Sequence, residues 1–65
     1  MKAVQFFHTV ASIVAKVADQ PLREVDPEAN VLGWFDSGAD ETDQVLAATE
    51  CANEILFENG YSVDD

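Results

Sequence analysis

The first third of the chain alternates hydrophobic and polar positions with the period of an α-helix. Apolar side chains recur at steps of three and four over residues 2–19, whereas Gln5, Thr9, Ser12 and Lys16 gather on the other side. This pattern predicts an amphipathic helix over residues 2–19, because a strand would place adjacent phenylalanines on opposite faces. The apolar residues expected in the core or in a dimer seam are Phe6, Phe7, Val10, Ile13, Val14 and Val17.

A second long amphipathic helix is predicted from about Asp40 to Asn59. Acidic residues crowd its first turn, where the helix dipole favours negative charge, and Gly60 follows it as a stop signal. The stripe expected to be buried consists of Val45, Ala48, Ala52, Ile55 and Leu56.

The residues between the long helices are predicted to form a connector over 19–27 and a short helix over about 27–36. Pro21 is expected to end the first helix at or before residue 20, and Asp26 with Pro27 suits the start of another. Gly33 weakens the helix, so a short extended segment over 30–35 is the alternative. Two arrangements are open for Trp34 and Phe35. Both side chains fill the core, or one is buried and the other is exposed as a binding anchor.

Together these segments predict an all-α fold. We expect one small three-helix domain over residues 1–60, in the order long, short, long, followed by a loose acidic tail over 61–65. The long helices would pair as a hairpin, and the short helix would close one end. The apolar arc of the first helix covers about half its circumference, more than one packing contact needs. A homodimer built on that helix would cover the excess, and the pattern leaves monomer and dimer both open.

Charge narrows the choice of partner. The 65 residues carry a formal net charge of −10, from 13 acids and 3 bases. Such a chain is not expected to bind nucleic acid or an anionic membrane directly, and it favours a basic protein partner or a high-salt environment. The charge is also partitioned, because residues 1–18 contain Lys2, Lys16 and no acid, and Arg23 is the only base after them.

The acids of the second long helix form a row. At ~100° per residue they fall within an arc of roughly 80°, which lies opposite the stripe expected to be buried. The members of this row are Asp40, Asp43, Glu50, Glu54 and Glu58. Successive glutamates lie ~6 Å apart along the axis, a spacing on the scale of the charge every ~3.4 Å along one strand of duplex DNA. Like charges four residues apart destabilise a helix by about 0.2–0.5 kcal/mol per pair.

These features lead to two functional hypotheses. The first is a small, non-enzymatic inhibitor or regulator whose acidic row occupies a basic, nucleic-acid-binding surface of a partner, with Trp34 as an apolar anchor. Small phage-type inhibitors that imitate DNA offer the analogy. The alternative is a structural or adaptor subunit that binds through the apolar faces of the first two helices. In that case the acids only keep the protein in solution or reflect adaptation to a halophilic environment.

Residues for catalysis or metal binding are sparse. Cys51 is the only cysteine and has acidic neighbours, so we expect a partly buried and unreactive thiol. His8 is the only histidine and has no second ligand nearby in the sequence, so no metal site or cofactor is predicted. We expect no enzyme activity. Polar residues interrupt the apolar run near the N-terminus, which argues against a signal peptide and predicts a cytoplasmic location.

Overall fold

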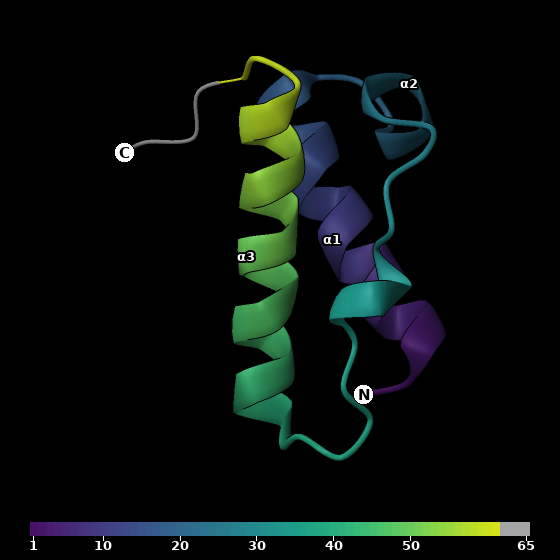
Figure 1. Ribbon diagram of the computed structural model, residues 1–65, viewed down its shortest axis with the longest axis vertical. Coiled ribbons are helices and arrows are strands. Elements are labelled where there is room, and N and C mark those ends of the chain that lie inside the picture. The colour runs from purple at the N-terminus through teal and green to yellow at the C-terminus, as the bar shows by residue number, and fades with distance from the viewer. Residues whose placement is uncertain (62–65) are drawn as a thin grey trace.

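The helices form a hairpin with a short irregular segment packed along it (Figure 1). The computed structural model describes residues 1–61, which contain helices and no strand. The elements are α1 (Ala3–Ala18), α2 (Leu22–Val25), the 3-10 turn η1 (Leu32–Trp34) and α3 (Glu41–Glu58). The predicted all-α fold, with three α-helices in the order long, short, long, is confirmed. The predicted tail lies outside the described residues, except for Tyr61.

The core lies between α1 and α3, which run side by side in Figure 1. On α1, Phe6, Val10 and Val14 are completely buried because steps of four residues keep them on one face. Phe7 and Val17 remain 41% and 42% exposed, so the predicted seam divides into a core part and an outer part. The buried apolar residues are Phe6, Val10, Val14, Ala18, Leu22, Val25, Val31, Ala48, Cys51, Ala52, Ile55 and Leu56.

The predicted connector over 19–27 contains a helix. α1 ends at Ala18, its C-cap residue Asp19 has a left-handed φ of 58°, and α2 begins directly after Pro21. Proline suits this position because its fixed φ, here −66°, is compatible with the start of a helix and no amide hydrogen is needed there. Leu22 and Val25 are three residues apart, and both are buried. Pro21 therefore separates two helices, whereas the sequence interpretation used it only as a stop.

The short helix predicted over 27–36 is present only as the single 3-10 turn η1, and the extended alternative over 30–35 is wrong. Two side chains hydrogen-bond to the backbone of this region. Asp26 Oδ1 accepts a hydrogen bond from the backbone N–H of Glu28 at 3.2 Å. Asn30 Oδ1 accepts one from the N–H of Gly33, also at 3.2 Å. A Cβ at position 33 would lie 2.5 Å from Asn30 Nδ2, so a larger residue there would displace the Asn30 side chain and disturb its hydrogen bond to the backbone.

The boundaries predicted for α3 are confirmed. Asp40 is the N-cap, and its Oδ1 accepts a hydrogen bond from the N–H of Asp43 at 2.9 Å. At the other end Gly60 adopts a φ of +87°, which a residue without a side chain tolerates. The N–H of Tyr61 then donates to the carbonyl of Leu56 at 2.8 Å and closes the helix.

The buried face of α3 contains four of the five predicted positions, but it excludes Val45 and includes Gln44 and Cys51. Val45 is 43% exposed, whereas its polar neighbour Gln44 is only 2% exposed. Gln44 can be buried because its amide is satisfied: Nε2 donates to the carbonyl of Asp36 at 3.0 Å, and Oε1 accepts from the amino group of Met1 at 2.7 Å. The core-facing side of α3 is therefore rotated relative to the prediction, which changes where the acidic row lies.

Candidate partner-binding groove

The acidic row of α3 lies beside the core and not opposite it. All five members are exposed: Asp40, Asp43, Glu50, Glu54 and Glu58. With Gln44, Cys51 and Ile55 on the buried face, the row is centred roughly 115° from the middle of that face at ~100° per residue. The prediction that the row faces the solvent is confirmed, whereas its predicted position opposite the buried stripe is corrected. The row follows the edge of α3, and its C-terminal end adjoins the segment 26–34.

The two ends of the row have different local explanations. Asp40 caps α3, and Asp43 lies in its first turn, where the helix dipole stabilises negative charge. Glu50, Glu54 and Glu58 lack such a reason, since residues 41–58 contain no lysine or arginine. Glu58 even occupies the last turn, where the dipole disfavours an acid. Of the few bases, Lys2 and Lys16 lie at the ends of the other long helix.

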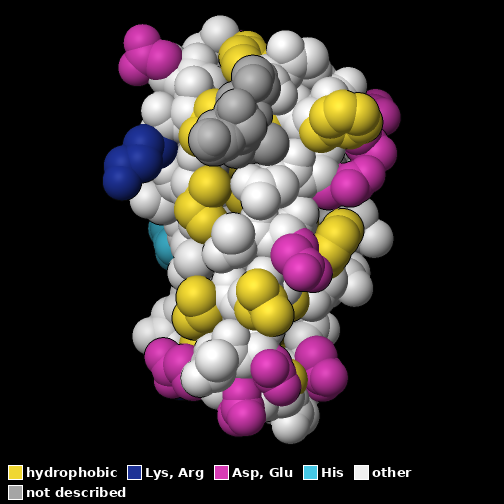
Figure 2. Space-filling model, turned by 90° about the vertical axis from the view of Figure 1, so that its left-hand side faces the viewer, with side chains coloured by type: hydrophobic (Ala, Val, Ile, Leu, Met, Phe, Trp, Pro, Cys, Tyr) yellow, Lys and Arg dark blue, Asp and Glu magenta, His cyan; other side chains and the backbone are white. Residues whose placement is uncertain are grey.

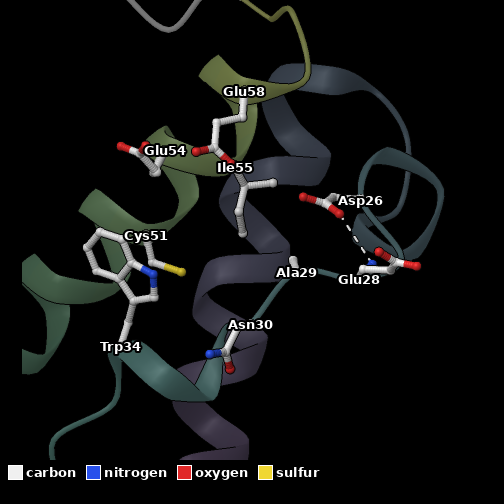
Figure 3. Close-up of a pocket in the computed structure, with 9 residues that line it drawn as sticks. All are labelled: Asp26, Glu28, Ala29, Asn30, Trp34, Cys51, Glu54, Ile55 and Glu58. Carbon is white, nitrogen blue, oxygen red and sulfur yellow. Dashed lines mark hydrogen bonds between the residues drawn. The ribbon is translucent and has the colours of Figure 1, made fainter.

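A groove of about 570 Å³ separates this end of α3 from the segment 26–34 (Figure 3). Glu54 and Glu58 lie on the α3 side, and Asp26 and Glu28 lie across from them. Four carboxylates from two distant parts of the chain thus border one opening. Its complete lining is Asp26, Glu28, Ala29, Asn30, Trp34, Cys51, Glu54, Ile55 and Glu58. Sequence reasoning missed Asp26 and Glu28, because only the fold of the loop brings them beside α3.

A hydrogen-bonded link holds the two sides of the groove together. Asn59 Nδ2 donates to Asp26 Oδ2 at 3.3 Å and to the carbonyl of Ile55 at 2.8 Å. The other carboxylate oxygen of Asp26 accepts from the backbone of Glu28. Both oxygens of Asp26 therefore have structural partners. Glu28, Glu54 and Glu58 are exposed to solvent and offer carboxylates to a ligand.

Trp34 and Phe35 point to different environments. Phe35 is half-buried, and its ring packs against that of Phe6 with centroids 5.3 Å apart. Trp34 is 40% exposed and lines the groove, where its indole lies beside Cys51 (Figure 3). Of the two arrangements left open by the sequence, the structure has one aromatic ring inward and the other outward. Trp34 is the outward one and gives the groove an apolar wall.

The groove offers little reactive chemistry. Burial raises the pKa of the Cys51 thiol from 9.0 to about 11, so this side chain is protonated near neutral pH and is a poor nucleophile. His8 lies elsewhere, beside a shallow hollow that it shares with Thr9, Ser12 and Ile13. Across residues 1–61, no group of three or more His, Cys, Asp and Glu side chains is arranged to hold a metal ion.

The remaining observations concern the chain as a whole. In the described part of the chain, no helix combines the length and the apolar character needed to cross a membrane. No family model, curated protein or solved structure matches the sequence or the fold. The groove and the acidic row are therefore the features from which a function is argued.

Proposed function

We propose that this chain is a small, non-enzymatic, acidic regulator or inhibitor that binds a basic surface of a partner protein through the carboxylate row of α3. The observation that carries the proposal is the groove, which is lined by Glu54, Glu58, Glu28 and Asp26 together with a partly exposed Trp34. A surface with this composition suits lysine or arginine side chains. Their aliphatic stems pack on apolar groups while their charged ends reach carboxylates.

The aromatic wall adds specificity to this charge complementarity. An arginine or lysine close to the face of an indole gains about 0.5–1 kcal/mol at an exposed site and more where water is excluded. Trp34 is a suitable anchor because it is held by neighbours on both sides: Phe35 packs into the core, and Gly33 is fixed by Asn30. Tryptophan is also enriched among the residues that dominate binding energy at interfaces.

A nucleic-acid-binding surface is the partner class that best fits the row. Charges ~6 Å apart are presented on one helix by Glu50, Glu54 and Glu58. A protein groove that binds a phosphate backbone presents a series of lysine and arginine side chains that could pair with them. The proposed mechanism is competition: the acidic helix occupies the basic groove and excludes the nucleic acid. Long-range attraction would make association fast and sensitive to salt.

The test compares two charge reversals of equal size. Glu54→Lys changes the row and the groove, whereas Glu24→Lys changes an exposed acid of α2 that does not line the groove. Each immobilised variant is incubated with cell lysate, and bound proteins are eluted first with DNA and then with detergent. We expect the parent and Glu24→Lys to retain a basic protein that DNA releases, and Glu54→Lys to lose it. Equal retention by both variants would contradict the proposal.

An adaptor function remains the second candidate, because α1 keeps exposed apolar side chains. Val4, Phe7 and Val17 are 59%, 41% and 42% exposed, and a partner or a second copy could cover them. Phe7→Glu combined with Val17→Glu tests this candidate without touching the completely buried Phe6 and Val10. Loss of the bound protein in this variant, together with release only by detergent, would favour the adaptor. A halophilic origin of the acids instead predicts that folding itself requires molar salt.

A further inference from the structure

The solvent side of α3 carries two large apolar side chains that nothing in residues 1–61 covers. Phe57 is 74% exposed and Leu46 is 54% exposed. They are eleven residues apart, which places them ~20° from each other around the helix and ~16 Å apart along it. Glu50 and Asn53 lie between them on the same side. We call Leu46, Glu50, Asn53 and Phe57 the outer strip of α3.

The outer strip runs alongside the acidic row. Around the helix, Phe57 lies ~20° from Glu50 and ~60° from Glu54, so apolar and acidic positions adjoin each other along three turns. Figure 2, which views the molecule from the α3 side of Figure 1, shows hydrophobic and acidic side chains interspersed over this face. A partner that covers the two apolar side chains must also approach the carboxylates.

We propose that the outer strip is the docking face for an amphipathic basic helix of the partner protein. Its apolar side chains would cover Leu46 and Phe57, and lysines or arginines between and beside them would meet Glu50 and Glu54. The occupant's basic character is taken from the proposed function, on which this inference rests. Its helical form follows from the strip itself, because two apolar contacts three turns apart on a straight helix match a second helix laid along it.

Charge also excludes a second copy of this chain as the occupant. Two strips placed face to face would bring Glu50 and Glu54 of both copies together, between molecules that each carry a net charge of −10. The exposed apolar side chains of α1 lie among positions without acids, so pairing of copies through that helix would meet no such repulsion. The two long helices therefore present surfaces for different kinds of partner.

The experiment measures binding of two model peptides by fluorescence anisotropy in ~150 mM salt. Both contain about 18 residues, or five helical turns, with the same numbers of leucine and lysine. One places all leucines on one helical face, and the other distributes them evenly. We expect the amphipathic peptide to bind more tightly. Leu46→Ser with Phe57→Ser should weaken binding of the amphipathic peptide by more than about tenfold, because two apolar contacts are lost. Binding of the peptide with evenly distributed leucines should not change.

Two controls make the result decisive. Phe7→Ser with Val17→Ser removes exposed apolar groups from α1 and should change neither affinity. Equal weakening by this control, or no weakening by the Leu46 and Phe57 variant, would overturn the inference. Sedimentation should show the same molecular mass for the parent and for the Leu46 and Phe57 variant. A parent dimer that this variant dissociates would overturn the inference by naming a second copy as occupant.

The outcomes also separate this inference from the proposed function. If Glu54→Lys weakens binding of both peptides and the Leu46 and Phe57 variant weakens neither, basic recognition stands and the outer strip is not a docking face. If Glu54→Lys leaves both affinities unchanged relative to Glu24→Lys, the proposed function fails, whatever the result for the Leu46 and Phe57 variant.

Discussion

The ring of Phe6 on α1 packs against the ring of Phe35, with centroids 5.3 Å apart and planes inclined at 54°. This tilted arrangement is a favourable one for aromatic pairs. It ties the segment before α3 to the first helix. Because Trp34 is the preceding residue, the same contact sets the position of the groove's aromatic wall. Core packing and the proposed binding site are thus joined through one pair of side chains.

Phe6→Ala should remove a large part of the free energy of unfolding. Phe6 is completely buried, and truncating such a phenylalanine costs about 3–5 kcal/mol. A chain of this size has a free energy of unfolding of only roughly 3–10 kcal/mol. Urea denaturation followed by circular dichroism measures the change. Phe7→Ala is the matched control, since Phe7 is 41% exposed and should lose about 1 kcal/mol or less. Equal losses would contradict the packing described.

Glu54→Lys should stabilise the fold while it weakens partner binding. The substitution replaces two like-charge pairs, with Glu50 and with Glu58, by two attractive pairs at the same spacing. We expect a gain of about 1 kcal/mol at low ionic strength. The urea midpoint should therefore rise, and the rise should shrink in ~0.5 M salt because the charges are screened. A lower midpoint at low salt would show that the row is stabilised by something other than the charges considered.

Asp40→Ala should destabilise α3 and weaken partner binding less than Glu54→Lys does, because Asp40 belongs to the acidic row but does not line the groove. Asp40 caps the helix through its hydrogen bond to the N–H of Asp43, and loss of such a cap costs about 0.5–2 kcal/mol. Asp43→Ala removes a neighbouring carboxylate that makes no capping bond, so its effect on the urea midpoint should be smaller. If Asp40→Asn preserves stability but abolishes binding, then Asp40 acts in recognition as well as in capping.

Cys51 should make stability sensitive to alkaline pH. Its pKa is raised by burial from 9.0 to about 11, so the protonated thiol is favoured in the folded state. This contribution is fully present below pH 9.0 and is lost as the pH rises toward 11. Between about pH 8 and pH 10.5, the parent should lose more unfolding free energy than Cys51→Ala. The two proteins differ only at residue 51, so parallel losses would contradict the predicted role of the thiol.

The long helices were predictable because each carries redundant signals. The apolar spacing of α1, the predicted start of α3 near Asp40 and the stop at Gly60 all depend on local sequence, and each is confirmed. The presence of a short helix between the long ones was predictable, but its position was not, because the short α-helix lies at Leu22–Val25 and not over 27–36. The Asp26 and Pro27 pair resembles a helix start, yet in the structure Asp26 closes a turn and binds Asn59. Hydrogen bonds between residues distant in sequence decided that outcome.

The candidate site was predictable only on its α3 side. Glu50, Glu54 and Glu58 follow from helical spacing, and Trp34 was identified as an anchor. Their relation to the core depended on Gln44, whose burial requires the carbonyl of Asp36. A hydropathy pattern contains no information about such a partner, so it favoured Val45 and placed the row opposite the core. Asp26 and Glu28 reached the groove through the fold of the loop, which the sequence pattern misjudged.

The separation of charge between the paired helices has a consequence for orientation. Lys2 and Lys16 lie on α1, and the acids of α3 lie on its neighbour, so the molecule carries an electric dipole across the helix pair. Near a basic surface that dipole experiences a torque, which turns α3 toward the surface before contact. The same rotation leaves α1 farther from the surface than α3. The apolar side chains that α1 exposes, Val4, Phe7 and Val17, would then stay available to another protein.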